Sequence, residues 1–200
     1  MCLAEVSKGA KRKIYLEYAA DLFQEIRQES NFEECTLSLS SVLLQQGREN
    51  EAKDLYLDVI QKCQSNKVTK SYYLSKSWME LGKWHRKQGQ AKKALDAFEQ
   101  AELAGSDKLL SGDQLLDLQI QKSDCLRAMG DPSAAMKVLS DVVNAKIVSQ
   151  KRLEAMYLRA EIYEQQGRPE LAKRQLETLA GKGGPWAKKA QETLDEHYVF

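Results

Sequence analysis

The sequence predicts an all-α protein built from consecutive helix hairpins, and three observations carry this prediction. Apolar residues recur every three or four positions along most of the 200-residue chain, which is the period of an amphipathic helix. Four glycines, each followed by the same pattern of small and large apolar residues, divide the chain into similar units. Proline and aspartate stand at several points where a helix is expected to begin.

The clearest unit is the stretch from Trp78 to Ala104. Two sets of apolar or small residues have helical spacing, one on each side of Gly89, where the first helix must stop. The stretch therefore predicts a hairpin whose two helices have matching apolar faces. Gly82 and Ala94 are small, so the two backbones can approach closely. The two sets are Trp78, Leu81, Gly82 and His85, then Ala94, Ala97, Phe98 and Ala101.

Three further units repeat this pattern around Gly47, Gly130 and Gly167. An alanine stands five residues after each of the four glycines, and a large apolar residue stands nine after it. A small residue always stands seven before the glycine, so several positions match in all four units and indicate a repeat. The alanines are Ala52, Ala94, Ala135 and Ala172, and the small residues are Ser40, Gly82, Ser123 and Ala160.

These positions resemble the tetratricopeptide repeat over roughly residues 33 to 181. One unit carries most of the signature of that family, in Trp78, Leu81, Gly82, Gly89, Ala94, Phe98 and Ala101. The other units lack the tryptophan, and Lys122 and Arg159 replace the leucine in two of them. The glycines are 42, 41 and 37 residues apart, against about 34 in the family, so the helices or loops are longer. The resemblance implies a right-handed α-solenoid.

The helices are expected in the following order. Residues 10 to 29 predict a first helix with one apolar stripe of Ile14, Tyr18, Leu22 and Ile26, as in a helix that packs on one side. We assign the whole chain to a single helical repeat domain. Its parts are an N-terminal helix or partial repeat at 1–32, hairpins at 33–64, 70–104, 113–145 and 149–181, and a C-terminal capping helix at 185–197.

Local signals support these boundaries. We expect Asp113 to cap one helix, and Asp131-Pro132 and Arg168-Pro169 to place a proline at the first position of two others. Gly105–Gly112 is the longest polar gap and is expected to be a loop. Pro185 opens the last helix, which places Trp186, Ala190 and Leu194 on one face. This face suits the end of a solenoid, where the outermost helix has nothing further to pack against.

Composition narrows the class of protein. The formal net charge is +1, which argues against a general nucleic-acid binder. No apolar run reaches the length of a membrane span, and the N-terminal stretch MCLAEVSKGAKRK lacks the apolar core of a secretion signal, so we expect a cytoplasmic protein. Cys2, Cys35, Cys63 and Cys125 are too far apart for a zinc motif, and Cys125 is interpreted as a core residue.

Motifs for catalysis are not found. The chain has no glycine-rich phosphate loop, no HExxH and no GxSxG. His85 stands where the other units have Leu43, Leu126 and Tyr163, so we interpret it as a packing residue. We expect no enzyme, no cofactor and no metal.

The resemblance implies that the first helix of each hairpin lines a concave groove, which would be basic in the second hairpin and acidic in the fourth. This predicts a protein partner or an acidic peptide, although an ordinary solvated surface explains the same charges. The arrangement that binds chaperone tails in this family is not found. The candidate contact residues are Lys76, Met79, Lys83, Arg86, Lys87, Asp124, Arg127, Tyr157 and Glu161, with Asp117, Ile120, Glu154 and Glu164 beside them.

Two alternatives remain open. The stretch from Trp78 to Ala104 also resembles helical repeats that flank the catalytic domain of phosphatidylinositol-3-kinase-related kinases, and the chain would then be a scaffold fragment of such an enzyme. The capping helix argues against this alternative. A pentatricopeptide-like array would bind RNA instead, but the near-neutral charge and the uneven repeat lengths argue against reading one base per repeat.

Overall fold

The computed structural model describes residues 10–29, 32–105 and 109–198, and over these ranges the secondary structure consists of ten α-helices without a strand. The segment before Ala10, where part of a partial repeat is predicted, lies outside the described residues. The helices are α1 (Ala10–Glu29), α2 (Phe32–Gln45), α3 (Glu49–Ser65), α4 (Tyr72–Lys87), α5 (Ala91–Ala104), α6 (Gly112–Ala128), α7 (Pro132–Asn144), α8 (Gln150–Gln165), α9 (Pro169–Ala180) and α10 (Pro185–His197).

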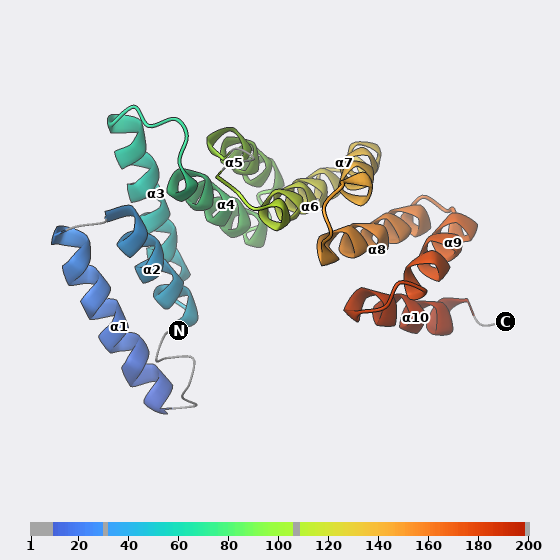
Figure 1. Cartoon of the computed structure of the whole chain (residues 1–200), viewed down its shortest axis with the longest axis horizontal. Helices are drawn as coiled ribbons and strands as arrows, with labels where there is room; N and C mark the ends of the chain where they lie inside the picture. Colours follow the sequence, from blue (N-terminus) through green and yellow to red (C-terminus); the bar gives the residue numbers. More distant parts are fainter. Residues whose placement is uncertain (1–9, 30–31, 106–108, 199–200) are drawn as a thin grey trace. The chain divides into compact units, whose positions relative to one another are not determined.

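Contacts divide the chain into two compact units, Met1–Leu109 and Leu110–Phe200. The sequence predicts one domain over these residues, and the division falls within the polar gap at Gly105–Gly112. In the first unit each helix packs against the next from α1 to α5, and in the second unit from α6 to α10 (Figure 1). The chain therefore has the all-α fold of stacked helix pairs that the sequence predicts.

A glycine in the left-handed region ends the first helix of each pair. At Gly89 φ is +71°, its N–H donates to the carbonyl of Arg86 at 2.9 Å, and the next N–H, of Gln90, donates to His85 at 3.0 Å. The same two bonds recur at Gly47, Gly130 and Gly167. This geometry satisfies the last carbonyl groups of the helix and reverses the chain within four residues. A side chain at these positions would be strained, which explains why all four are glycine.

The pair α4–α5 is held by a close fit between a glycine and an aromatic ring. A Cβ atom placed on Gly82 would lie 2.6 Å from Cε1 and 2.7 Å from Cδ1 of Phe98, which is itself fully buried. The hydroxyl of the buried Ser75 on α4 donates to the carbonyl of Ala101 on α5 at 2.7 Å. The prediction that Gly82 is small because a second helix packs on it is confirmed.

The other pairs have the same small position. Ser40, Ser123 and Ala160 are buried, and the alanines at the position five residues after the turn glycine are fully buried in all four pairs. The two serine hydroxyls donate to carbonyls one turn earlier in their own helices, at 2.8 Å for Ser40 and 2.7 Å for Ser123. A buried hydroxyl is thereby paired inside the helix without occupying the space that the neighbouring helix needs.

Helix α1 packs through a face other than the predicted stripe. Leu16 and Ala20 are buried against α2, with Ala19 and Phe23 beside them, whereas the stripe from Ile14 to Ile26 is exposed. The stripe is therefore not the side of α1 that packs on α2. Both sides of the helix are apolar, so periodicity alone does not choose between them. The side with two alanines allows α1 to approach α2 more closely.

The structure confirms the predicted start of α7 and differs from the prediction at α6. Asp131 accepts a hydrogen bond from the backbone N–H of Ala134 at 2.8 Å, and Pro132 occupies the first helical position, as predicted. The cap of α6 is Ser111 rather than Asp113. Ser111 and Gln114 form a reciprocal capping box that places Asp113 in the first turn. At the other end of the unit, Ala190 of α10 is buried against α8 and α9, with Trp186 and Leu194 beside it.

We predict that Gly82→Ala destabilises the protein by about 1–3 kcal/mol, because the added methyl group overlaps the Phe98 ring. In an ordinary helix interior the same change stabilises by about 1 kcal/mol. The free energy of unfolding, measured by urea denaturation, distinguishes the two outcomes.

The double variant with Phe98→Leu supplies the control. If the steric conflict is the cause, Gly82→Ala costs less when Phe98 is already leucine, because a smaller side chain leaves room for the methyl group. A variant Gly82→Ala that unfolds at higher urea concentration than the natural chain contradicts the close fit.

Candidate partner-binding face

We call the helix that precedes the turn glycine the first helix of each pair. On the first helices α4, α6 and α8, three positions that are not used for packing carry polar residues, and they lie 13, 6 and 3 residues before the turn glycine. In the first unit they are occupied on α4 by Lys76, Lys83 and Arg86, and Lys87 follows at the helix end. In the second unit they are Asp117, Asp124 and Arg127 on α6, and Glu154, Glu161 and Glu164 on α8. We refer to these residues, unit by unit, as the first-helix faces. Most of their side chains are half-buried rather than fully solvated.

Two lysines share one carboxylate on α4. The Nζ atoms of Lys76 and Lys83 lie 2.9 Å and 3.0 Å from the same oxygen, Oε1 of Glu80. Burial alone would raise the pKa of Glu80, but the charges of Lys83 and Lys76 and their hydrogen bonds together lower it. Glu80 is therefore ionised at neutral pH and positions two ammonium groups next to each other. The cluster of these three residues, the Lys76–Glu80–Lys83 cluster, has one positive charge in excess.

The rest of the basic run is partly compensated from another helix. Lys87 forms a salt bridge with Glu49 at the start of α3, and Arg86 is exposed. The sequence places Lys83, Arg86 and Lys87 in an interval without acids, but it does not show the carboxylate that α3 supplies. Lys87 is therefore compensated by a carboxylate of α3, whereas Lys76 and Lys83 share Glu80 on their own helix.

Met79 and Tyr157 are buried, so the expectation that they contact a partner does not fit this structure. Met79 is 2% exposed and Tyr157 is 7% exposed. Both occupy the position ten residues before the turn glycine, where the other pairs have Leu37 and Ile120. Successive first helices contact each other within each unit, α2 with α4, α6 with α8, and α8 with α10. An apolar residue at this position is therefore buried in the hydrophobic interior.

Tyr157 shows how this position packs. Its hydroxyl is 3.0 Å from the hydroxyl of Thr193 on α10, and its ring centroid is 5.6 Å from that of Trp186. The ammonium group of Lys189 lies 4.2 Å from the centre of the Tyr157 ring. Tyr157 thus joins α8 to the terminal helix instead of facing a partner.

The second unit reverses the charge ratio seen on α4. Lys151 lies 2.6 Å from Asp117 on α6 and 3.0 Å from Glu154 on α8. Burial alone would lower the pKa of Lys151, but the hydrogen bonds with the two carboxylates raise it. Sequence reasoning missed Lys151 because it lies outside the three polar positions. Its spacing of three residues from Glu154 was the available signal.

A second cluster in this unit brings three predicted residues together. Nη1 of Arg127 lies 3.2 Å from Glu161 on α8 and 3.9 Å from Asp124 on its own helix. Further along α8, Glu164 accepts a hydrogen bond from the hydroxyl of Tyr198 at 2.7 Å, which together with burial raises the pKa of Tyr198 to about 12. Arg127 and Lys151 therefore each contact two carboxylates, and the cluster of Lys151, Asp117 and Glu154 has one negative charge in excess.

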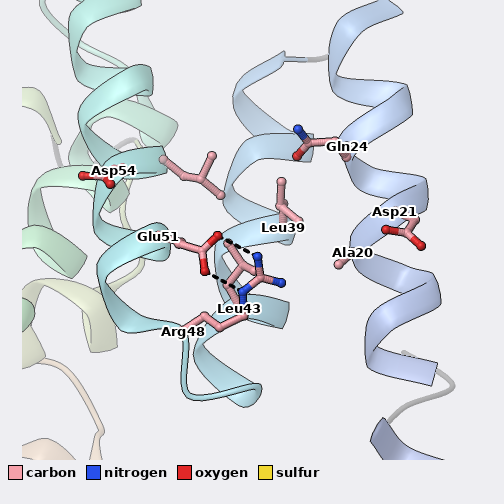
Figure 2. A pocket seen from close by; sticks show the side chains of 9 residues that line it. Ala20, Asp21, Gln24, Leu39, Leu43, Arg48, Glu51 and Asp54 are labelled. Atoms are coloured by element: carbon pink, nitrogen blue, oxygen red, sulfur yellow. Dashed lines mark hydrogen bonds and ion pairs between the residues drawn. The ribbon is translucent and has the colours of Figure 1, made fainter. Parts of the chain in front are cut away.

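A pocket of about 410 Å³ lies between α1, α2 and α3, outside the predicted set. Its apolar surface comes from Leu39, Leu43 and Leu55, with Ala20 beside them. Figure 2 shows Arg48 and Glu51 joined by two contacts in front of Leu43, with both donor–acceptor distances 2.6 Å. The hydrogen bond from Arg48 lowers the pKa of Glu51. This pair spans the start of α3, so we interpret it as support for the turn between α2 and α3.

Other kinds of site receive no support from the described part of the chain. No group of three or more histidine, cysteine or acidic side chains within it could hold a metal ion. Cys35, Cys63 and Cys125 are buried free thiols, and burial raises the pKa of Cys63. The interpretation of Cys125 as a core residue is confirmed. In the same ranges, every helix is too short or too polar to cross a bilayer.

Solved structures with the same arrangement of helices identify the fold. The chain is similar to a putative kinesin light chain from Podosopora anserina with nearly identical TPR-like repeats, with a TM-score of 0.70 and 20% identity over 94% of each chain. The chain has the tetratricopeptide repeat fold. A tetratricopeptide repeat family model also matches residues 154–182, which include most of α8 and all of α9.

Two further tetratricopeptide-like structures are similar over nearly the whole chain. MamA matches with a TM-score of 0.64 and 15% identity, over 98% of this chain and 99% of that one. A thermophilic TPR protein of Thermus thermophilus matches with a TM-score of 0.54 and 18% identity, over 90% of this chain and 91% of that one. No curated protein sequence matches the chain. The structural similarity establishes the fold. The sequence identities are too low to transfer the role of any residue, so the residues of the faces are interpreted from their own chemistry.

We predict that Glu80→Gln lowers the free energy of unfolding by about 1–2 kcal/mol at pH 7, because two charge-assisted hydrogen bonds are weakened. The folded-state pKa of Glu80 is depressed, so its contribution is present above the ordinary value of 4.5 and is lost as the pH falls through the folded-state pKa. Urea denaturation of the two proteins should therefore give converging stabilities towards about pH 3.

Glu99→Gln on α5 is the matched control, because that carboxylate is exposed. It should change stability little at either pH. A deficit of Glu80→Gln that stays constant from pH 7 to about pH 3 would show that charge is not the cause.

Proposed function

We propose that this chain is a non-catalytic scaffold and that the first-helix face of each unit binds a segment of another protein. Proteins with the tetratricopeptide repeat fold typically act as protein-binding scaffolds. The observation that carries the proposal is the unequal charge ratio of the half-buried clusters. Lys76 and Lys83 share one carboxylate on α4, whereas Lys151 and Arg127 each contact two carboxylates of α6 and α8.

The Lys76–Glu80–Lys83 cluster suits an acidic side chain of the partner. Its two ammonium groups are positioned by one carboxylate, so a second carboxylate can interact with both without reorganising them. Because each lysine side chain remains 34% exposed, the donors are accessible to a ligand. Their pre-organisation reduces the entropy lost on binding.

The face of the second unit suits basic side chains. Lys151 is one cation between the two carboxylates of Asp117 and Glu154, and a lysine or arginine of the partner would balance the excess of that cluster. The same excess would repel a phosphate backbone, which supports a protein partner over RNA. The buried free thiols suit a reducing compartment, which supports the cytoplasm as the location of the complex.

The energy of such contacts is modest. Partly exposed ion pairs contribute about 0–1 kcal/mol each, so several must act together. Charges of this kind mainly raise the association rate and make it sensitive to salt. We therefore expect an affinity that falls clearly between low and moderate ionic strength.

We predict that peptides selected from a random library on the intact chain are enriched in aspartate and glutamate. The triple variant Lys76→Gln, Glu80→Gln, Lys83→Gln should bind the selected peptide at least about tenfold more weakly, a change of about 1.4 kcal/mol. It removes both ammonium groups without leaving the carboxylate unpaired. Isothermal titration calorimetry gives the dissociation constants, and circular dichroism verifies the fold.

The matched control is Lys92→Gln, Lys93→Gln, Asp96→Asn on α5, which changes the net charge by the same amount on exposed positions. It should bind as the natural chain does. Equal losses in both triple variants would assign the effect to net charge, and unchanged binding in the α4 variant would remove this face from the proposal.

A further inference from the structure

The outward side of α1 carries a row of exposed apolar side chains, which we call the α1 outer stripe. Its largest exposures are 63% for Ile14 and 60% for Tyr18. Exposed apolar rows of this length are uncommon on a soluble surface and mark sites of association. The members of the stripe are Ile14, Tyr15, Tyr18, Leu22 and Ile26.

The opposite side of the same helix is already used inside the unit. Leu16 and Ala20 are buried against α2, so the stripe cannot be the face that attaches α1 to the rest of the chain. An α-helix that is apolar on both sides has a second surface to bury. An occupant of the stripe would therefore be an element other than α2.

The charges along α1 indicate which occupant fits. Its first half carries Lys11, Arg12 and Lys13 against Glu17, with no acid in the first turn, and is net positive. Its second half carries Asp21, Glu25 and Glu29 against Arg27 and is net negative. This order is the reverse of what the helix dipole favours, since acids stabilise the N-terminal end and bases the C-terminal end. A neighbouring helix of opposite direction would bring compensating charge to both ends.

We propose that two copies of this chain associate through antiparallel packing of their α1 outer stripes. A twofold axis near Ala20 places Ile14 of one copy opposite Ile26 of the other, and Tyr18 opposite Leu22. The basic start of each helix then lies beside the acidic second half of its partner. Parallel packing would instead place like charges together at both ends. The surface is complementary to itself, as a closed twofold interface requires.

The interface is small, so the association should be weak. One helix from each copy buries less area than the roughly 1,600 Å² of a typical stable complex. Sedimentation velocity of the full chain should therefore show a reversible monomer–dimer equilibrium with a dissociation constant of about 1–100 μM. Tyr18→Glu should leave the chain monomeric over this range. Leu103→Glu on α5, a leucine that is also mostly exposed, is the control and should not change the equilibrium.

Charge reversal tests the direction of packing. Lys11→Glu with Lys13→Glu should weaken the dimer at least tenfold, because both ends of α1 then carry acids, and Glu25→Lys with Glu29→Lys should do the same. All four substitutions in one chain restore opposite charges at the two ends and should restore the dimer. Circular dichroism of each variant verifies that α1 remains helical.

Three results would overturn the proposal. The first is a natural chain that stays monomeric up to about 300 μM, well above the expected dissociation constant. The second is a monomeric chain that dimerises only when residues 1–9 are deleted, which would mean that this segment covers the stripe. The third is a dimer that Tyr18→Glu leaves unchanged, or that the four-fold reversal does not restore.

Discussion

The fit of a large apolar side chain against a small residue on the facing helix is the constraint on which the hairpins depend. In α4–α5, Gly82 leaves the space that Phe98 fills, and buried serine or alanine occupies the same position in the other pairs. Because protein interiors are close-packed, one added methyl group is enough to change the free energy of unfolding. One side of each first helix is therefore committed to its hairpin, and polar residues are confined to what remains.

This confinement explains why the charges of the first-helix faces form clusters. Half-buried charges need partners, so Lys76 and Lys83 meet at Glu80, and Lys151 bridges Asp117 and Glu154. The clusters hold the side chains in place before any partner arrives. Their unequal ratios of cations to carboxylates leave charge that a ligand of opposite sign can balance. Under the proposed function, packing and recognition use different sides of the same helices.

The sequence was sufficient for features that depend on local chemistry. A turn that needs a positive φ requires glycine at Gly89 and its equivalents, and a close approach requires a small residue at Gly82, so both leave a visible pattern. Features that depend on other helices were not predictable in the same way. Helical period places Met79 beside Lys83, but its burial depends on packing that the period does not show. The partner of Lys87 likewise comes from α3, 38 residues away. On α1 two sides are apolar, and the side that packs on α2 is the one whose alanines allow the two helices to approach more closely.

The central claim is that partners contact the first helices and not the second ones. Site-specific photo-cross-linking tests it directly, with benzoylphenylalanine placed either at Lys87 on α4, which is exposed and outside the Lys76–Glu80–Lys83 cluster, or at Lys93 on α5, in otherwise natural chains. Each chain is illuminated with the peptide that the intact protein selects. The account predicts a covalent adduct from position 87 and little or none from position 93. Equal yields from both positions, or a higher yield from position 93, would contradict it.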